Sequence, residues 1–154
     1  MTESLEAYTD TLARFYSVWK PLENHLLSCP HPDTLDISNR LRADRLEADL
    51  RSLNTPPLPV LSPPFSSSDR PTLAGILYVL EGSRHGGKMI SKVACERLPV
   101  TLQDGCQFFA QDPSSFSENW QSFVHWTHSL DEAEVVTAAA VSEQTFKFIQ
   151  SAFV

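Results

Sequence analysis

The stretch LYVLEGSRHGGKMISK, from Leu77 to Lys92, places three glycines inside what otherwise has the pattern of one long apolar helix. Apolar side chains recur at helical spacing both before and after it, as expected for an α-helix. An interior glycine costs about 1 kcal/mol relative to alanine. Gly82, Gly86 and Gly87 therefore require a reason.

Two interpretations account for these glycines. Gly82 and Gly86 are four residues apart and share one helix face, so a flat ligand can lie almost against the backbone and the helix can bend there. Alternatively, one helix ends at the glycines and a turn containing His85 leads into a second helix, because glycine-interrupted helices are a weak motif. The spacing leaves both interpretations open.

Helical periodicity continues through the rest of the chain, and no alternating strand of useful length or internal repeat occurs. We therefore predict an all-α fold. A chain of 154 residues is close to the most common domain size, so we expect residues 1–154 to form a single domain. The five main helices are expected near residues 3–28, 36–52, 70–97, 114–128 and 131–153.

Local signals refine this prediction in two places. The segment Asn54–Pro71 is rich in proline and serine, which excludes regular structure and favours an extended strap. Its apolar side chains are expected to pack down, namely Leu58, Val60, Leu61 and Phe65. Capping-box patterns at Ser115-x-x-Glu118 and Ser129-x-x-Glu132 mark the starts of the last two helices.

Charge and composition narrow the class of protein. The formal net charge of −7 argues against nucleic acid or an anionic membrane as a main partner. No run of about 20 apolar residues that would span a membrane is present, and the acidic N-terminus does not have the pattern of a signal peptide. Cys29, Cys95 and Cys106 are odd in number and show no C-x-x-C spacing, which indicates reduced thiols and a cytoplasmic location.

Other candidate chemistry is sparse. His125 and His128 are three residues apart on a predicted helix and would be able to share a metal ion, but no further ligand motif accompanies them. We interpret them as a solvated or hydrogen-bonded pair. No phosphate-binding loop, nucleophile elbow or H-E-x-x-H motif is present.

The pattern LEGS-x-x-GG, Leu80–Gly87, resembles the glycine-rich distal helix of the heme oxygenase family, in which a kinked helix passes over the heme face. It is most similar to the bacterial branch found with bacteriophytochromes. Four more segments resemble other helices of that branch: Tyr8–Leu27, Arg42–Leu53, Phe108–Trp126 and Ala138–Phe153.

This resemblance implies an activity and a set of site residues. The activity is oxygen-dependent cleavage of heme to biliverdin, carbon monoxide and iron, with heme as both substrate and cofactor and an external electron donor. Catalytic positions would be Gly82, Ser83 and Gly86, with Ser83 holding a water, and His85 and Gly87 would join them in contacting heme. A phytochrome or a reductase would be the protein partner.

The resemblance also has departures. The family's proximal histidine lies on a helix that precedes the segment similar to Tyr8–Leu27, and on this alignment that helix is absent. Gln121 and Ser122 stand where a basic residue usually pairs with a heme propionate. His85 is then the nearest candidate ligand for the iron. The alternative function is a non-catalytic relative that binds heme, biliverdin or another protein.

The missing helix leads to an expectation about association. The first predicted helix carries aromatic side chains around much of its surface, namely Tyr8, Phe15, Tyr16 and Trp19. Without the proximal helix, part of this aromatic surface would be exposed. Exposed apolar patches of several hundred Å² are rare on monomers. We therefore expect a homodimer or another chain docked over that face.

Overall fold

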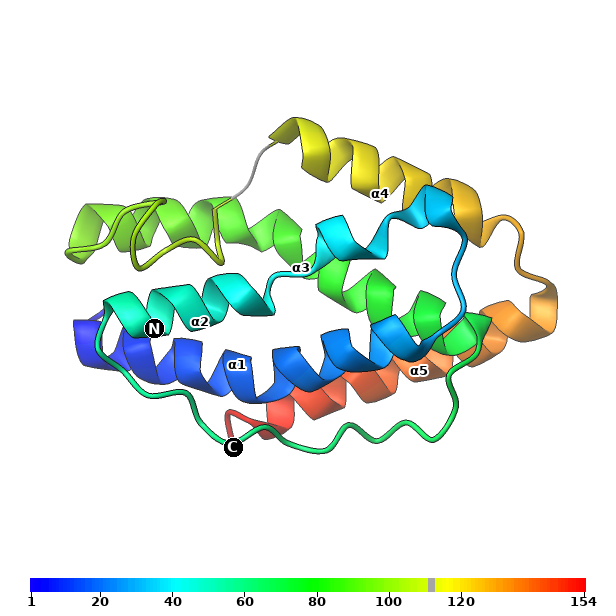
Figure 1. The fold of residues 1–154 in the computed structure, drawn as a ribbon, viewed down its shortest axis with the longest axis horizontal. Coiled ribbons are helices and arrows are strands. Elements are labelled where there is room, and N and C mark those ends of the chain that lie inside the picture. Colours follow the sequence, from blue (N-terminus) through cyan, green and yellow to red (C-terminus); the bar gives the residue numbers. More distant parts are fainter. Residues whose placement is uncertain (111–112) are drawn as a thin grey trace.

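The computed structural model describes residues 1–110 and 113–154 (Figure 1). Its α-helices are α1 (Leu5–Ser28), α2 (Ala43–Ser52), α3 (Arg70–Arg97), α4 (Pro113–Thr127) and α5 (Glu132–Ser151), with short 3-10 helices at Asp33–Leu35 and Ile37–Arg40. The described residues form no strand, so the prediction of an all-α fold with five main helices is confirmed. No helix in these two ranges combines the length and apolar character needed to cross a membrane.

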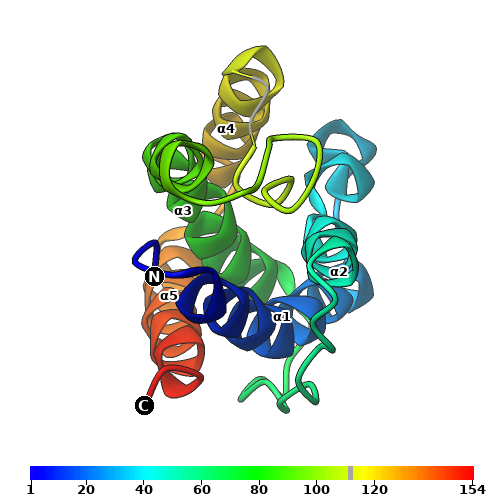
Figure 2. The ribbon, with the colours of Figure 1, turned by 90° about the vertical axis from the view of Figure 1, so that its left-hand side faces the viewer.

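The helices pack in pairs around α3. α1 lies against α2, and α3 packs mainly against α5. Figures 1 and 2 both place α4 at the opposite edge of the molecule from α1 and α5. α4 contacts the first 3-10 helix and α3.

The glycine segment lies inside one continuous helix. α3 begins at the Asp69 N-cap, whose carboxylate accepts a 2.9 Å hydrogen bond from Thr72 N, and continues without interruption to Arg97. The alternative of two helices joined by a turn at His85 is therefore wrong. Figure 1 shows α3 changing direction part way along its length, in agreement with a bent rather than a broken helix.

The aromatic side chains of α1 are largely covered, contrary to expectation. Tyr8 and Trp19 are 0% and 3% exposed. Phe15 and Tyr16 are half-buried. From the loop after α3, the Phe108 ring lies 5.0 Å from Trp19 and 5.9 Å from Phe15, and the Phe109 ring lies 6.4 Å from Tyr8. The exposed apolar side chains lie on other helices, for example Met89 on α3 and Val136 on α5.

Three helix starts differ from the prediction. α4 begins at Pro113, so the Ser115-x-x-Glu118 pattern lies inside that helix rather than at its start. Asp36 adopts a left-handed backbone with φ of 42° between the two 3-10 helices, so the α-helix expected from residue 36 begins only at Ala43. The capping box of α5 is formed by Asp131 and Glu134. The Ser129-x-x-Glu132 pattern is therefore two residues out of register.

The proline-rich strap is more exposed than expected. Residues 54–69 are irregular, and Leu61 N donates to Ser17 O on α1 over 2.8 Å. Phe65 is partly buried, and its ring lies 5.5 Å from that of His25. The expectation of burial is wrong for Leu58, Val60 and Leu61, which are at least 40% exposed.

Gly75 lets α3 and α5 cross at close range. An ideal Cβ on Gly75 would lie 2.6 Å from both Ala138 O and Val141 Cβ. Ser142 Oγ donates to Gly75 O over 3.2 Å at the same crossing. A side chain at position 75 would therefore push the two helices apart.

Gly75→Ala is expected to lower the free energy of unfolding by about 1–3 kcal/mol, the usual cost of overpacking. Urea denaturation followed by circular dichroism measures this change. Gly82→Ala is the matched control, because its Cβ would meet open space and alanine favours a helix by about 0.5–1 kcal/mol. Equal stability of both variants would contradict the close crossing.

Candidate functional site

Two of the α3 glycines face open space. Ala74, Tyr78, Gly82 and Gly86 follow one another at intervals of four residues and so lie along one side of α3. An ideal Cβ on Gly82 or Gly86 would have no atom of the described residues within 4 Å. Packing within these residues therefore does not explain the glycines, whereas a ligand that approaches the backbone would.

A cavity of about 620 Å³ borders the same side of α3 at Ala74 and Tyr78, whereas Gly82 and Gly86 are not among its lining residues. This volume falls within the range of about 300–1,000 Å³ that is typical of small-molecule and cofactor sites. Three helices and the connection from α4 to α5 border it, it is open to solvent on one side, and most of its lining is apolar. The lining residues are Ala74, Tyr78, Trp120, Phe123, Val124, Thr127, His128, Leu130, Val135, Ala138, Ala139 and Ser142.

Aromatic rings connect the cavity with the glycine segment. Trp120 of α4 lies 6.1 Å from Tyr78, measured between ring centroids, and 5.3 Å from His85. The His85 ring is also edge-on to Phe116 at 4.7 Å. Its Nδ1 lies 2.9 Å from Gly82 O. His85 therefore forms part of a wall between α3 and α4.

Ser83 and Gly87 face another side of α3. They border a second cavity of about 30 Å³ together with Arg42, Arg84 and Phe108. Ser83 Oγ donates to Leu80 O over 2.7 Å. The predicted site residues therefore fall into two groups, with Gly82, His85 and Gly86 on or beside the open side and Ser83 and Gly87 at the smaller cavity.

The smaller cavity is polar enough to hold water. A water needs about 10–15 Å³ and several polar partners. Arg42 Nε is buried and makes no hydrogen bond within the described residues. Burial and the nearby Arg84 and Arg45 side chains lower the pKa of Arg42 to about 9. A water between Arg42 and Ser83 would supply the missing acceptor.

Arg40 fixes α4 beside α3. Its guanidinium donates to Asn119 O at 2.9 Å and Ser122 Oγ at 2.7 Å, both on α4. It also lies 3.6 Å from the Glu81 carboxylate of α3, and both side chains are 2% exposed. Burial lowers the pKa of Arg40, while the Glu81 carboxylate acts in the opposite direction. Arg40 thus positions the wall of the larger cavity.

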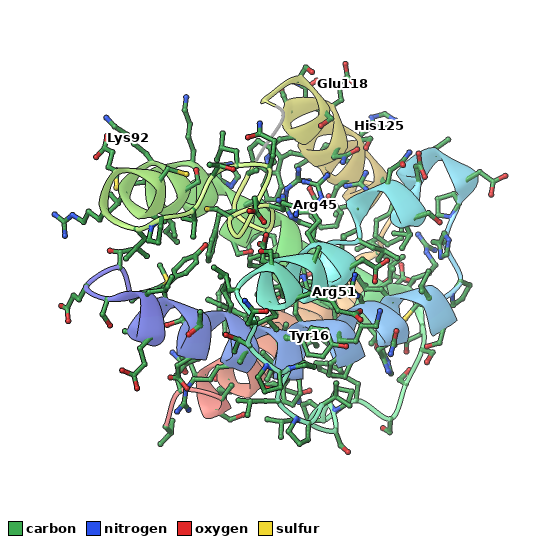
Figure 3. All side chains as sticks on the ribbon, turned by 60° about the vertical axis from the view of Figure 1, so that its left-hand side comes forward. Tyr16, Arg45, Arg51, Lys92, Glu118 and His125 are labelled. Atoms are coloured by element: carbon green, nitrogen blue, oxygen red, sulfur yellow. The ribbon has the colours of Figure 1, made fainter. Side chains whose placement is uncertain are left out.

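The two neighbouring histidines do not form a metal cluster. No group of three or more His, Cys, Asp or Glu side chains in residues 1–110 and 113–154 is placed to hold a metal ion. His128 lines the larger cavity, whereas His125 does not. His125 is an exposed residue of α4 (Figure 3).

Sequence reasoning missed several of these residues. It assigned no role to Tyr78, although Tyr78 lies four residues before Gly82 and that spacing would have placed it on the same side. Trp120 directly precedes Gln121 and Ser122, and its contacts with Tyr78 and His85 join segments far apart in the sequence. No sequence signal pointed to Arg40, because its partners are distant along the chain.

Comparison with known proteins supports the fold. No protein-family model and no curated protein sequence matches the chain. Its structure is similar to the NO- and CO-bound crystal structures of the heme oxygenase from Neisseria meningitidis, with a TM-score of 0.80 and 20% sequence identity. The match covers 98% of this chain and 76% of that one. The chain therefore has a heme oxygenase-like fold.

Arg40→Met is expected to lower the free energy of unfolding by about 3–5 kcal/mol, because it removes one partner of a buried ion pair. Urea unfolding followed by circular dichroism tests this. Arg51→Met is the control, since the Arg51 side chain is 76% exposed and pairs with Glu47 on the surface of α2 (Figure 3). The control should change stability by less than about 1 kcal/mol. Similar effects of the two substitutions would contradict the role of Arg40.

Proposed function

We propose that this protein binds heme and cleaves it, as a heme oxygenase does. The observation that carries the proposal is the 620 Å³ cavity that borders α3 at Ala74 and Tyr78, about two turns and one turn before the open position of Gly82. A flat, largely apolar group matches both features, because it fills an apolar cavity and approaches a backbone without side chains. The heme oxygenase-like fold supports the same assignment.

The residues of the cavity fit heme in shape and chemistry. Tyr78 and Trp120 provide aromatic surface, and small side chains of α5 such as Ala138 and Ala139 leave room beside them. None of the described lining residues is Lys or Arg, so the heme propionates would have to reach solvent or residues outside the lining. When bound, heme would supply the iron that activates oxygen and would itself be oxidised, with electrons from an external donor.

The protein's own contribution would be positioning and control of water. Gly82 and Gly86 would allow close approach of the ligand to α3. Ser83 and Arg42 would hold a water at the smaller cavity, behind the open side of the helix. His85, which the sequence suggests as an iron ligand, remains a prediction; its contacts with Phe116 and Trp120 place its ring at the edge of the site.

A non-catalytic protein that binds heme or biliverdin is the second candidate. Ser122, at a position where the family usually has a basic residue, accepts a hydrogen bond from Arg40. Gln121, the preceding residue and also uncharged, is exposed. A site with no cation at these positions would hold the propionates less firmly, and a tetrapyrrole would then be bound without the fixed orientation that cleavage needs.

The expected partners also remain predictions. A phytochrome would receive biliverdin, a reductase would supply electrons, and both would act in the cytoplasm. The homodimer expected from the sequence would have to use a face other than the aromatic side of α1, which is already covered. Exposed Val135 and Val136 on α5 are available for such contacts.

Gly82→Leu and Gly86→Leu are expected to weaken hemin binding by about tenfold or more, because each puts a side chain where the ligand would lie. Titration followed by the Soret absorbance measures the dissociation constant. Both proteins should remain folded, since their side chains point into open space. Ala140→Leu is the control, at an exposed α5 position outside the cavity lining. Unchanged binding in both glycine variants would exclude this site.

Turnover separates the two candidate functions. The hemin complex is mixed with a reductase system and oxygen, and biliverdin formation is followed by absorbance with catalase present. Stoichiometric biliverdin that is unaffected by the peroxide scavenger is the result expected for the enzyme. Stable heme under the same conditions, with normal binding, would assign the non-catalytic function.

A further inference from the structure

The proline-rich strap between α2 and α3 presents an uncovered run of proline and apolar side chains. All of residues 56–62 are exposed, and Leu58 and Val60 are 42% and 54% exposed. Figures 1 and 2 both place this strap at the edge of the molecule beside α1. We infer that residues 56–59, Pro-Pro-Leu-Pro, form a docking site for a protein partner whose uncharged, aromatic-lined groove binds a polyproline II helix.

The backbone of this stretch meets the requirements of a polyproline II helix. The proline ring fixes φ near −65° at Pro56, Pro57 and Pro59, and a residue that precedes proline is restricted to extended conformations. None of residues 55–69 has a positive φ. Residues 56–62 form no backbone hydrogen bond with one another, as expected for a helix that has none. At three residues per turn, the exposed run supplies about two turns.

Contacts with α2 and α1 hold the stretch in place. Thr55 N donates to Leu50 O over 2.9 Å at its start, and Leu61 N donates to Ser17 O over 2.8 Å beyond its last proline. The residues between these two contacts keep their exposed surface. A ligand segment that is already extended and tied at both ends loses less conformational entropy when a partner binds it.

The composition of the strap selects among the known ways of recognising an extended segment. Three of residues 56–59 are proline and have no N–H, so the segment is unsuited to pair as an added β-strand. Residues 54–68 contain no Lys, Arg, Asp or Glu. A groove that relies on an acidic pocket would therefore find no basic side chain to pair with. An uncharged groove lined by aromatic side chains matches the prolines and Leu58.

The experiment titrates the isotope-labelled full chain with an isolated WW domain that binds Pro-Pro-Leu-Pro peptides, followed by NMR. Saturable shifts are expected at the Leu58 and Val60 amides. Leu58→Ala and Pro59→Ala should each weaken binding about tenfold or more. Both positions are exposed, so both proteins should fold, which circular dichroism checks. Pro64→Ala is the matched control, because it removes an exposed proline of the same strap outside residues 56–59 and should leave the affinity unchanged.

Three results would overturn the inference. The first is the absence of saturable shifts at about 1 mM WW domain, and the second is wild-type affinity in both Leu58→Ala and Pro59→Ala. The third is tighter binding to an SH3 domain with an acidic specificity pocket, which would contradict the uncharged groove. The strap does not border the larger cavity, so hemin binding should be the same in all of these variants. Failure of this inference is therefore separate from failure of the proposed function.

Discussion

The buried guanidinium of Arg40 is the interaction on which the geometry of the site depends. It joins the Glu81 carboxylate of α3 to Asn119 and Ser122 of α4, and also donates to Leu35 O in the first 3-10 helix. A planar group with five donors is suited to such a junction, whereas an ammonium group is not. Without it, α4 would be held against α3 mainly by the ring contacts of Phe116 and Trp120, and one wall of the larger cavity would be less firmly positioned.

This junction also explains how α3 can carry glycines in its middle. Glu81 immediately precedes Gly82 and is held by Arg40 on one side and Arg84 on the other. The helix is therefore anchored through a charged side chain at the point where the glycines provide no packing of their own. The desolvation of these charges is costly. The ion pairs of Glu81 with Arg40 and Arg84, and the hydrogen bond from Arg40 to Asn119 O on α4, offset part of that cost.

The sequence predicts the helices well because helical periodicity and caps are local properties. It also places Gly82 and Gly86 correctly on one side of a helix, and their open surroundings agree with a ligand-facing role. It fails where the outcome depends on distant contacts. Phe108 packs against Trp19 although the two residues are 89 positions apart in the sequence, and no periodic pattern predicts this contact. Tyr78, Trp120 and His128 border one cavity only because three helices meet there, so no local pattern groups them.

The close crossing at Gly75 has a mechanical consequence. Contact between the α3 backbone and Ala138 and Val141 leaves almost no space between the helices at that point, so translation of α5 toward α3 is blocked there. A change in the width of the neighbouring cavity would require α5 to rotate relative to α3 about this crossing. The α5 residues that line the cavity all lie within about one turn of this crossing, so rotation would move them little: Val135, Ala138, Ala139 and Ser142. The close crossing therefore fixes the width of the cavity between α3 and α5, because the residues that line it on α5 cannot move apart from the helix pair.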